Sequence, residues 1–92
     1  MPTERNVKKL EGFDTELHAV IPAQEVREDI EKAIRFAVRY FPEAGRFTGR
    51  AAPLPLFAWT LKATERTPPL TVYYCFDANT VILVSVQVAE RK

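Results

Sequence analysis

The C-terminal stretch LTVYYCFDANTVILVSVQV, residues 70–88, most strongly limits how this chain can fold. Apolar side chains at Leu70, Val72 and Tyr74 alternate with residues of the other parity, a period typical of a strand with two distinct faces. Residues 77–79, Asp-Ala-Asn, favour a turn because Asp and Asn side chains hydrogen-bond nearby backbone groups. The following run VILVSV has apolar residues at both odd and even positions, that is, on both faces of a strand. This pattern predicts a central strand covered on each side or a tightly wrapped sheet. The whole stretch therefore predicts a β-hairpin.

A second periodic segment runs from Pro22 to Phe41 and predicts one long amphipathic helix. Its apolar residues follow the i, i+3, i+4 spacing: Val26, Ile30, Ala33, Ile34, Ala37, Val38 and Phe41. Pro22 suits the first turn of a helix, and Pro42 and Gly45 end it. Acidic residues come early and basic residues late, which complements the helix dipole, so the basic C-terminal half has a purely structural explanation.

The remaining segments are read from alternation and from turn residues. TELHAVI (residues 15–21) and FAWTLKAT (residues 57–64) alternate in polarity and predict two more strands. Residues 43–55, EAGRFTGRAAPLP, carry glycines and prolines and predict a loop, and residues 65–69 predict a turn. Residues 1–12 are highly charged and predict a flexible N-terminal lead-in.

These elements predict the fold class α+β with two layers. One long helix packs on a four-stranded, mostly antiparallel sheet in the chain order β-α-β-β-β. The first strand rejoins the sheet through a right-handed crossover, parallel to its neighbour. With 92 residues, the chain has room for a single domain, which we place at residues 13–92.

Several classes of function lack their sequence signals. The chain has no glycine-rich phosphate loop, no Cys/His metal spacing and no nucleophile elbow, so we expect no metal and no cofactor. The single cysteine, Cys75, excludes an internal disulfide framework and suits a reducing cytoplasm. No apolar run approaches the length of a membrane-spanning helix, and the polar N-terminus does not resemble a secretory signal.

Charge is distributed unevenly although the net charge is only +1. Residues 1–31 sum to −4 and residues 32–66 to +5. The distribution indicates either an oriented surface for RNA, DNA or an acidic protein partner, or an ordinary solvated surface. The candidate nucleic-acid-binding residues are Arg39, Arg46 and Arg50.

A small set of side chains could support catalysis without a metal. Lys62 is placed on the outer face of its strand, Arg66 in the following turn and Tyr73 opposite the core face. Cations stabilise a developing phosphorane charge, and a Tyr can exchange protons, which together would suffice to cleave RNA through its own 2′-OH. His18, the only histidine, fits an exposed strand position better than a catalytic one.

The order strand–helix–PEAGR–loop–FAWTLKAT–turn–LTVYYCFDANTVILVSV resembles the RelE/ParE superfamily of bacterial toxin–antitoxin toxins. The matching pieces are Pro42-Glu43-Ala44-Gly45-Arg46, the strand around Lys62, and the C-terminal hairpin. The resemblance implies a RelE/ParE-like fold and a cytoplasmic, toxin-like component of a type II toxin–antitoxin system, neutralised by a cognate antitoxin. Its target would be RNA and translation, as a metal-independent endoribonuclease acting on mRNA at the ribosome, or DNA gyrase.

The sequence also departs from the family pattern. Members usually have two helices before the loop, where this chain has room for about one long helix. Gln87 and Val88 occupy the region where the ribonuclease branch carries a His or Tyr, so catalysis itself stays open. The alternative is a non-catalytic interaction or dimerisation module of degenerate RelE/ParE-like fold, whose edge strand or aromatic face (Phe57, Trp59) recruits a partner. A homodimer is left open in either case.

Overall fold

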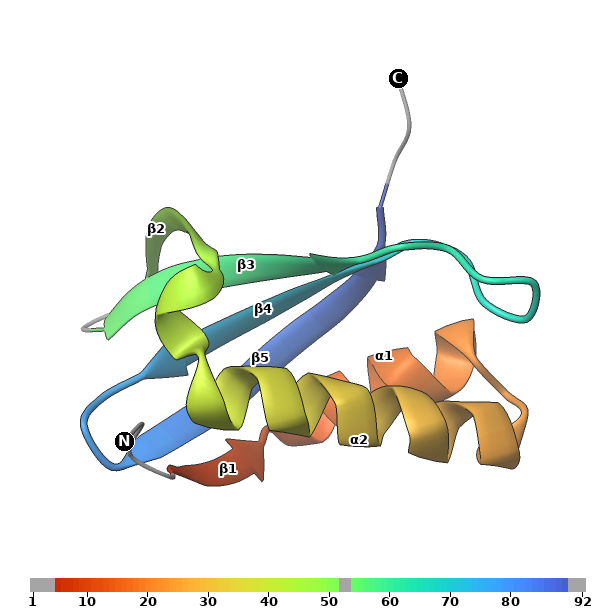
Figure 1. Ribbon diagram of the computed structural model, residues 1–92, viewed down its shortest axis with the longest axis horizontal. Coiled ribbons are helices and arrows are strands. Elements are labelled where there is room, and N and C mark those ends of the chain that lie inside the picture. Colours follow the sequence, from red (N-terminus) through yellow and green to blue (C-terminus); the bar gives the residue numbers. More distant parts are fainter. Residues whose placement is uncertain (1–4, 52–53, 90–92) are drawn as a thin grey trace.

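The computed structural model describes residues 5–51 and 54–89, which form two helices and a five-stranded mixed sheet (Figure 1). The elements are β1 (Asn6–Lys9), α1 (Glu11–Val20), α2 (Gln24–Tyr40), the short 3₁₀ helix η1 (Pro42–Ala44), β2 (Arg46–Ala51), β3 (Leu54–Leu61), β4 (Leu70–Phe76) and β5 (Thr80–Val88). The predicted α+β class is confirmed. The predicted count of one helix and four strands is wrong and is corrected to two helices and five strands.

The sheet has the strand order β1-β5-β4-β3-β2. The strands β5, β4, β3 and β2 are joined by antiparallel pairing, whereas β1 pairs with β5 in parallel. The predicted C-terminal hairpin is confirmed, with Phe76 opposite Val81. Its register shifts in mid-strand, because Tyr73 faces Ser85 while Tyr74 faces Leu83, so Val84 is the extra residue of a β-bulge.

Helix α1 replaces the strand that alternation predicted at residues 15–21. The alternating residues Leu17, Ala19 and Ile21 are only part of the apolar pattern, because Phe13, Leu17 and Ile21 also recur at helical spacing. All three of the latter residues are buried, Phe13 and Leu17 completely. Tertiary packing therefore selects the helical period, and Pro22 follows the end of α1 instead of starting α2.

Residues 6–9, which the sequence placed in a flexible lead-in, form β1. This strand is largely exposed, and polar contacts with α2 reinforce its parallel pairing. Arg35 Nη1 donates to the Val7 carbonyl at 3.2 Å, and Lys9 Nζ lies 3.1 Å from Glu31 Oε1. Charged residues separated by more than 20 positions thus secure an element that has no strong strand signal of its own.

The predicted loop at residues 43–55 is instead η1 followed by β2 and the start of β3. Glycine and proline are tolerated there because β2 is an edge strand with an irregular register between Phe47 and Gly49. Gly49 has φ +149°, a conformation that other residues rarely adopt. Strand β3 accordingly begins at Leu54 and ends at Leu61, earlier than predicted, so Lys62 follows the strand.

One hydrophobic core joins both helices to a single face of the sheet. Residues from α1 and α2 pack on Leu70, Val72 and Tyr74 of β4 and on Val81, Leu83 and Val86 of β5. Phe57, Trp59 and Leu61 of β3 are only partly buried against this core. The helices therefore cover the β1-β5-β4 half of this face more completely than the β3-β2 half (Figure 1). No helix of the described residues is long and apolar enough to cross a membrane.

The β4–β5 turn makes a contribution to stability that depends on pH. Asp77 Oδ1 accepts hydrogen bonds from the backbone N–H groups of Asn79 and Thr80, both at 2.8 Å, and these bonds lower the pKa of the Asp77 carboxyl. Because the folded pKa lies below the unfolded value, this contribution is present above about pH 4 and is lost as pH falls through the folded pKa. We expect the urea midpoint to fall less between pH 7 and pH 3 in Asp77→Asn than in the wild type. The control is Asp29→Asn, an exposed helix variant whose urea midpoint should fall as much as that of the wild type. An equal fall in Asp77→Asn and in the wild type would contradict this expectation.

Candidate docking surface

A hollow of about 220 Å³ opens where the C-terminal end of α2 meets the sheet. Its lining is entirely apolar or aromatic: Ala37, Val38 and Phe41 from α2 and its end, Ala44 from η1, Trp59 from β3 and Tyr74 from β4. It lies on the helix-bearing face, at the border of the half that the helices cover less completely. Concave apolar sites of this kind are typical places for a ligand or for a partner's side chain.

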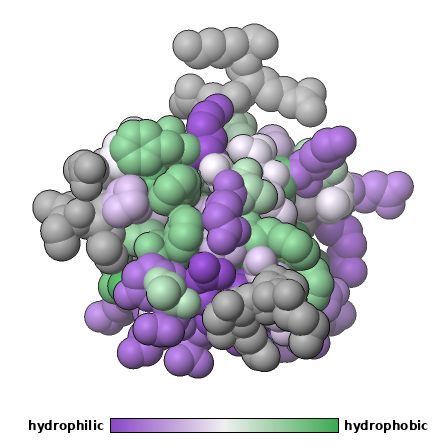
Figure 2. Space-filling model, turned by 60° about the vertical axis from the view of Figure 1, so that its left-hand side comes forward, coloured by the Kyte–Doolittle hydropathy of each residue, from purple (hydrophilic) through white to green (hydrophobic). Residues whose placement is uncertain are grey.

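Three phenylalanines of the described residues are strongly exposed, and one of them, Phe41, lines this hollow. Phe36 is 62% exposed, Phe41 55% and Phe47 57%. The Phe36 ring contacts Tyr40 on α2, and the Phe47 ring meets Phe57 edge-on, with 5.9 Å between the ring centroids. Figure 2 brings the β2 end of the sheet forward and shows hydrophobic groups gathered among hydrophilic ones. We call the set Phe36, Tyr40, Phe41, Phe47, Phe57 and Trp59 the aromatic surface. Contiguous exposed apolar patches are typical of interaction sites.

One buried hydrogen bond holds η1 and the start of β2 in place. The Tyr74 hydroxyl donates to the Pro42 carbonyl at 2.6 Å. Burial raises the pKa of the Tyr74 phenol, so it keeps the proton that this bond requires. Gly45 passes so close that an added Cβ would lie 2.0 Å from Tyr74 Oη. The PEAGR segment thus anchors the start of β2, whose first two residues are Arg46 and Phe47.

The predicted catalytic residues do not form one cluster. Tyr73 lies on β4 opposite Ala58. Lys62 follows Ala58 by four residues and lies past the end of β3. At roughly 3.3 Å per strand residue, Lys62 is about 13 Å from the Ala58–Tyr73 pair. Arg66 is exposed in the β3–β4 connection beyond it. Their catalytic roles remain predictions.

The predicted nucleic-acid-binding arginines also lie apart. Arg46 of β2 pairs with Ala58, which pairs with Tyr73, so Arg46 and Tyr73 share one cross-strand row on the face away from the helices. Arg39 is half-buried on α2, in the other layer. Arg50 lies on β2, opposite Pro55. The register therefore places Arg46 and Tyr73 in the same row with Ala58 between them, an arrangement that the sequence did not indicate.

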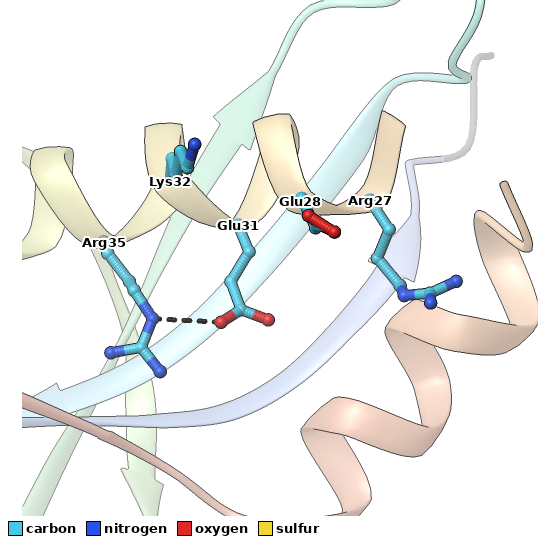
Figure 3. A pocket seen from close by; sticks show the side chains of 5 residues that line it. All are labelled: Arg27, Glu28, Glu31, Lys32 and Arg35. Atoms are coloured by element: carbon cyan, nitrogen blue, oxygen red, sulfur yellow. Dashed lines mark hydrogen bonds and ion pairs between the residues drawn. The ribbon is translucent and has the colours of Figure 1, made fainter. Parts of the chain in front are cut away.

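A second hollow, of about 190 Å³, lies along the charged side of α2 (Figure 3). Its lining residues are Arg27, Glu28, Glu31, Lys32 and Arg35. Most of these charges already serve the fold. Glu31 pairs with Arg35 at 3.0 Å and with Lys9, and Arg27 donates to the carbonyls of Ile21 and Pro22. This hollow is therefore a structural seam between α2, β1 and the α1–α2 connection.

Neither a metal cluster nor a reactive thiol is found in the described part of the chain. Residues 5–51 and 54–89 contain no group of three or more His, Cys, Asp or Glu side chains that could hold a metal ion. Cys75 is buried, and burial raises the pKa of its thiol, which disfavours the reactive thiolate.

The fold resembles that of a known toxin–antitoxin structure. The chain matches a chain of a solved structure described as "Chromosomal ParDE TA system from P. aeruginosa" with a TM-score of 0.63. The match covers 95% of this chain and 98% of the other, at 12% sequence identity. No family model and no curated protein matches the sequence. The chain therefore shares the fold of a chain of this ParDE structure, which confirms the predicted resemblance at the level of fold.

Part of the aromatic surface could be predicted from the sequence. The alternation in FAWTLKAT indicated the aromatic face of Phe57 and Trp59. Phe36 and Phe47 were missed as surface residues, although Phe36 falls outside the apolar stripe of its helix. A large apolar residue away from the stripe of an amphipathic helix is the signal that would have found it.

Proposed function

We propose that this chain is the toxin-like component of a type II toxin–antitoxin system, is located in the cytoplasm, and is neutralised by a cognate antitoxin bound to the aromatic surface. The observation that carries the proposal is the apolar hollow, which the exposed Phe41 lines, on a fold shared with a chain of a ParDE structure. A toxin needs a surface that a small partner can cover, and aromatic anchors in and around a pocket are typical centres of binding energy.

Of the two target classes, the arrangement favours a protein such as DNA gyrase over mRNA. A metal-independent ribonuclease needs cations and a proton-exchanging group within hydrogen-bond reach of one phosphate. Lys62 and Arg66 lie beyond the end of β3, whereas Tyr73 lies in the middle of β4. This separation supports a toxin that acts by binding its target. The second candidate function is a non-toxic interaction module, for which the same aromatic surface would serve as the binding site.

Growth measurements distinguish these functions. We expect induced expression of the wild type to arrest a bacterial host, and the double variant Lys62→Ala/Arg66→Ala to arrest it equally. Relief of arrest by this double variant would favour the ribonuclease. Normal growth at good soluble expression would contradict the toxin proposal and favour the interaction module.

Substitutions in the aromatic surface test neutralisation. Phe41→Ser and Phe47→Ser are expected to keep the growth arrest but to weaken binding of the proposed cognate antitoxin at least tenfold, since hot-spot anchors cost about 2 kcal/mol or more when removed. The matched control is Leu10→Ser, because Leu10 is also 49% exposed but lies between β1 and α1. Unchanged affinity in both phenylalanine variants, measured by calorimetry, would place the antitoxin site elsewhere.

A further inference from the structure

Strand β5 is apolar on both faces, but the described part of the chain covers only one of them. Val81, Leu83 and Val86 point into the core beneath the helices. Ile82 and Val84 lie outside the core cluster and are only partly buried. A strand that is apolar in both parities is typical of a sheet with a layer on each side. Residues 5–51 and 54–89 supply no second layer on this side.

The uncovered side, which we call the open face, has an apolar centre. Ile82 pairs with Cys75 of β4, and Tyr73 pairs with Ala58 of β3. Leu56 precedes Phe57, whose ring packs with Tyr74 on the helix-bearing side, so Leu56 belongs to the open face. Cys75 and Ala58 are almost fully buried beneath their larger neighbours, whereas Leu56, Tyr73 and Ile82 keep partial exposure.

The charged strand residues of the open face are positive, and one carboxylate, Glu16 of α1, accepts a hydrogen bond at 3.0 Å from Oγ of Ser85, the β5 residue that pairs with Tyr73. Among the described residues, every acidic side chain lies in a helix, in η1 or in a connection between strands, and none lies in a strand. Lys8 pairs with Ile82 at the β1 edge, and Arg46 pairs with Ala58 at the β2 edge. These two edges are four strand spacings apart, about 19 Å. Lys62 adds a third exposed cation past the end of β3, where it lines a hollow of about 500 Å³ with Thr60 and Pro69.

These features limit what can cover the open face. A second copy of the chain would bring the same cations against each other around its apolar centre. Single-stranded nucleic acid is held by many phosphate contacts and by several stacking aromatics, and the open face offers three cations and the single ring of Tyr73 among the described residues. Aliphatic side chains between cations match a ligand that is apolar in the middle and acidic at its ends.

We propose that the open face binds an acidic, amphipathic segment of a partner protein. Its apolar side chains pack on Ile82, Tyr73 and Leu56, and its carboxylates approach Lys8, Arg46 and Lys62. This surface is separate from the aromatic surface, which lies on the other side of the sheet, so the inference holds whether or not the chain is a toxin.

A peptide-binding experiment tests this inference with the full chain. The probe is a fluorescein-labelled 16-residue peptide with a central Leu/Ile segment and three glutamates at each end. A second peptide with lysine in place of every glutamate, and a 15-nucleotide single-stranded DNA, serve as competitors. We expect the acidic peptide to bind, and Lys8→Glu/Arg46→Glu to weaken its binding at least tenfold. The matched control Lys32→Glu, an exposed residue on α2, should change affinity less than twofold.

Methyl NMR places the peptide on the protein. Ile82 and Val84 methyl resonances should shift on addition of the acidic peptide, while those of the core residues Leu17 and Val38 should stay unchanged. Absence of binding, equal binding of the lysine peptide, or displacement of the acidic peptide by the single-stranded DNA would overturn the proposal. Shifts confined to the aromatic surface would also overturn it.

Discussion

Phe13→Ala is expected to lower the free energy of unfolding by about 3–5 kcal/mol, because a fully buried phenylalanine leaves a cavity when it is truncated. Phe13 has no exposed surface and sits in the core cluster with Leu17 and residues of both central strands. Urea denaturation monitored by Trp59 fluorescence measures the change. For a small domain, such a loss is a large fraction of the total stability.

His18→Ala is the control, since His18 is exposed on the same helix and should change stability by less than about 0.5 kcal/mol. The comparison also tests α1 itself. If residues 15–21 formed a strand preceded by a loose segment, Phe13 would lie outside the core, and its truncation would cost no more than that of His18.

Gly45→Ala is expected to cost about 2–5 kcal/mol, through overpacking and through disruption of a buried hydrogen bond. The new Cβ would lie 2.0 Å from Tyr74 Oη, 2.8 Å from Tyr74 Cζ and 3.1 Å from the Ala58 carbonyl oxygen. Tyr74 cannot retreat without losing the bond to Pro42, and its ring is buried. We therefore expect η1 to detach from the sheet, so that amide hydrogen exchange at the start of β2 increases along with the loss of stability.

Gly12→Ala is the matched control, because nothing lies within 4 Å of the Cβ it would add and the position is helical. Alanine should be neutral or stabilising there by up to about 1 kcal/mol. Adding Tyr74→Phe to Gly45→Ala removes the closest contact but not the one to Cζ, so only part of the loss should return. Equal stability of Gly45→Ala and Gly12→Ala would show that the close approach is not a constraint.

The two proposed binding surfaces lie on opposite faces of the sheet. The aromatic surface occupies the helix-bearing side at the β3-β2 half, and the cationic open face lies behind it. Strand β2 connects them, since successive residues point to opposite sides: Phe47 belongs to the aromatic surface and Arg46 to the open face. The Tyr74–Pro42 bond and Gly45 thus position one residue of each surface.

The sequence alone determined the elements whose periodicity is long and unambiguous. The hairpin at residues 70–88 and the helix ending near Phe41 were predicted because their apolar residues repeat over many positions at one period. The absence of motifs for metal or covalent chemistry was likewise readable, as was the aromatic face of Phe57 and Trp59. These features depend only on local spacing and residue type.

Tertiary structure decided everything that depended on a distant neighbour. In residues 13–21, both a period of two and a helical period are present, and burial of Phe13 against β5 selected the helix. β1 forms because its backbone pairs with β5 and because Arg35 and Glu31 of α2 bind Val7 and Lys9. These partners are distant in sequence, so the four residues of β1 do not reveal them. Arg46 and Tyr73 share one row, with Ala58 between them, only through the register of three strands. Pairing between strands is non-local, and for that reason the neighbours of each residue across the sheet could not be assigned from the sequence.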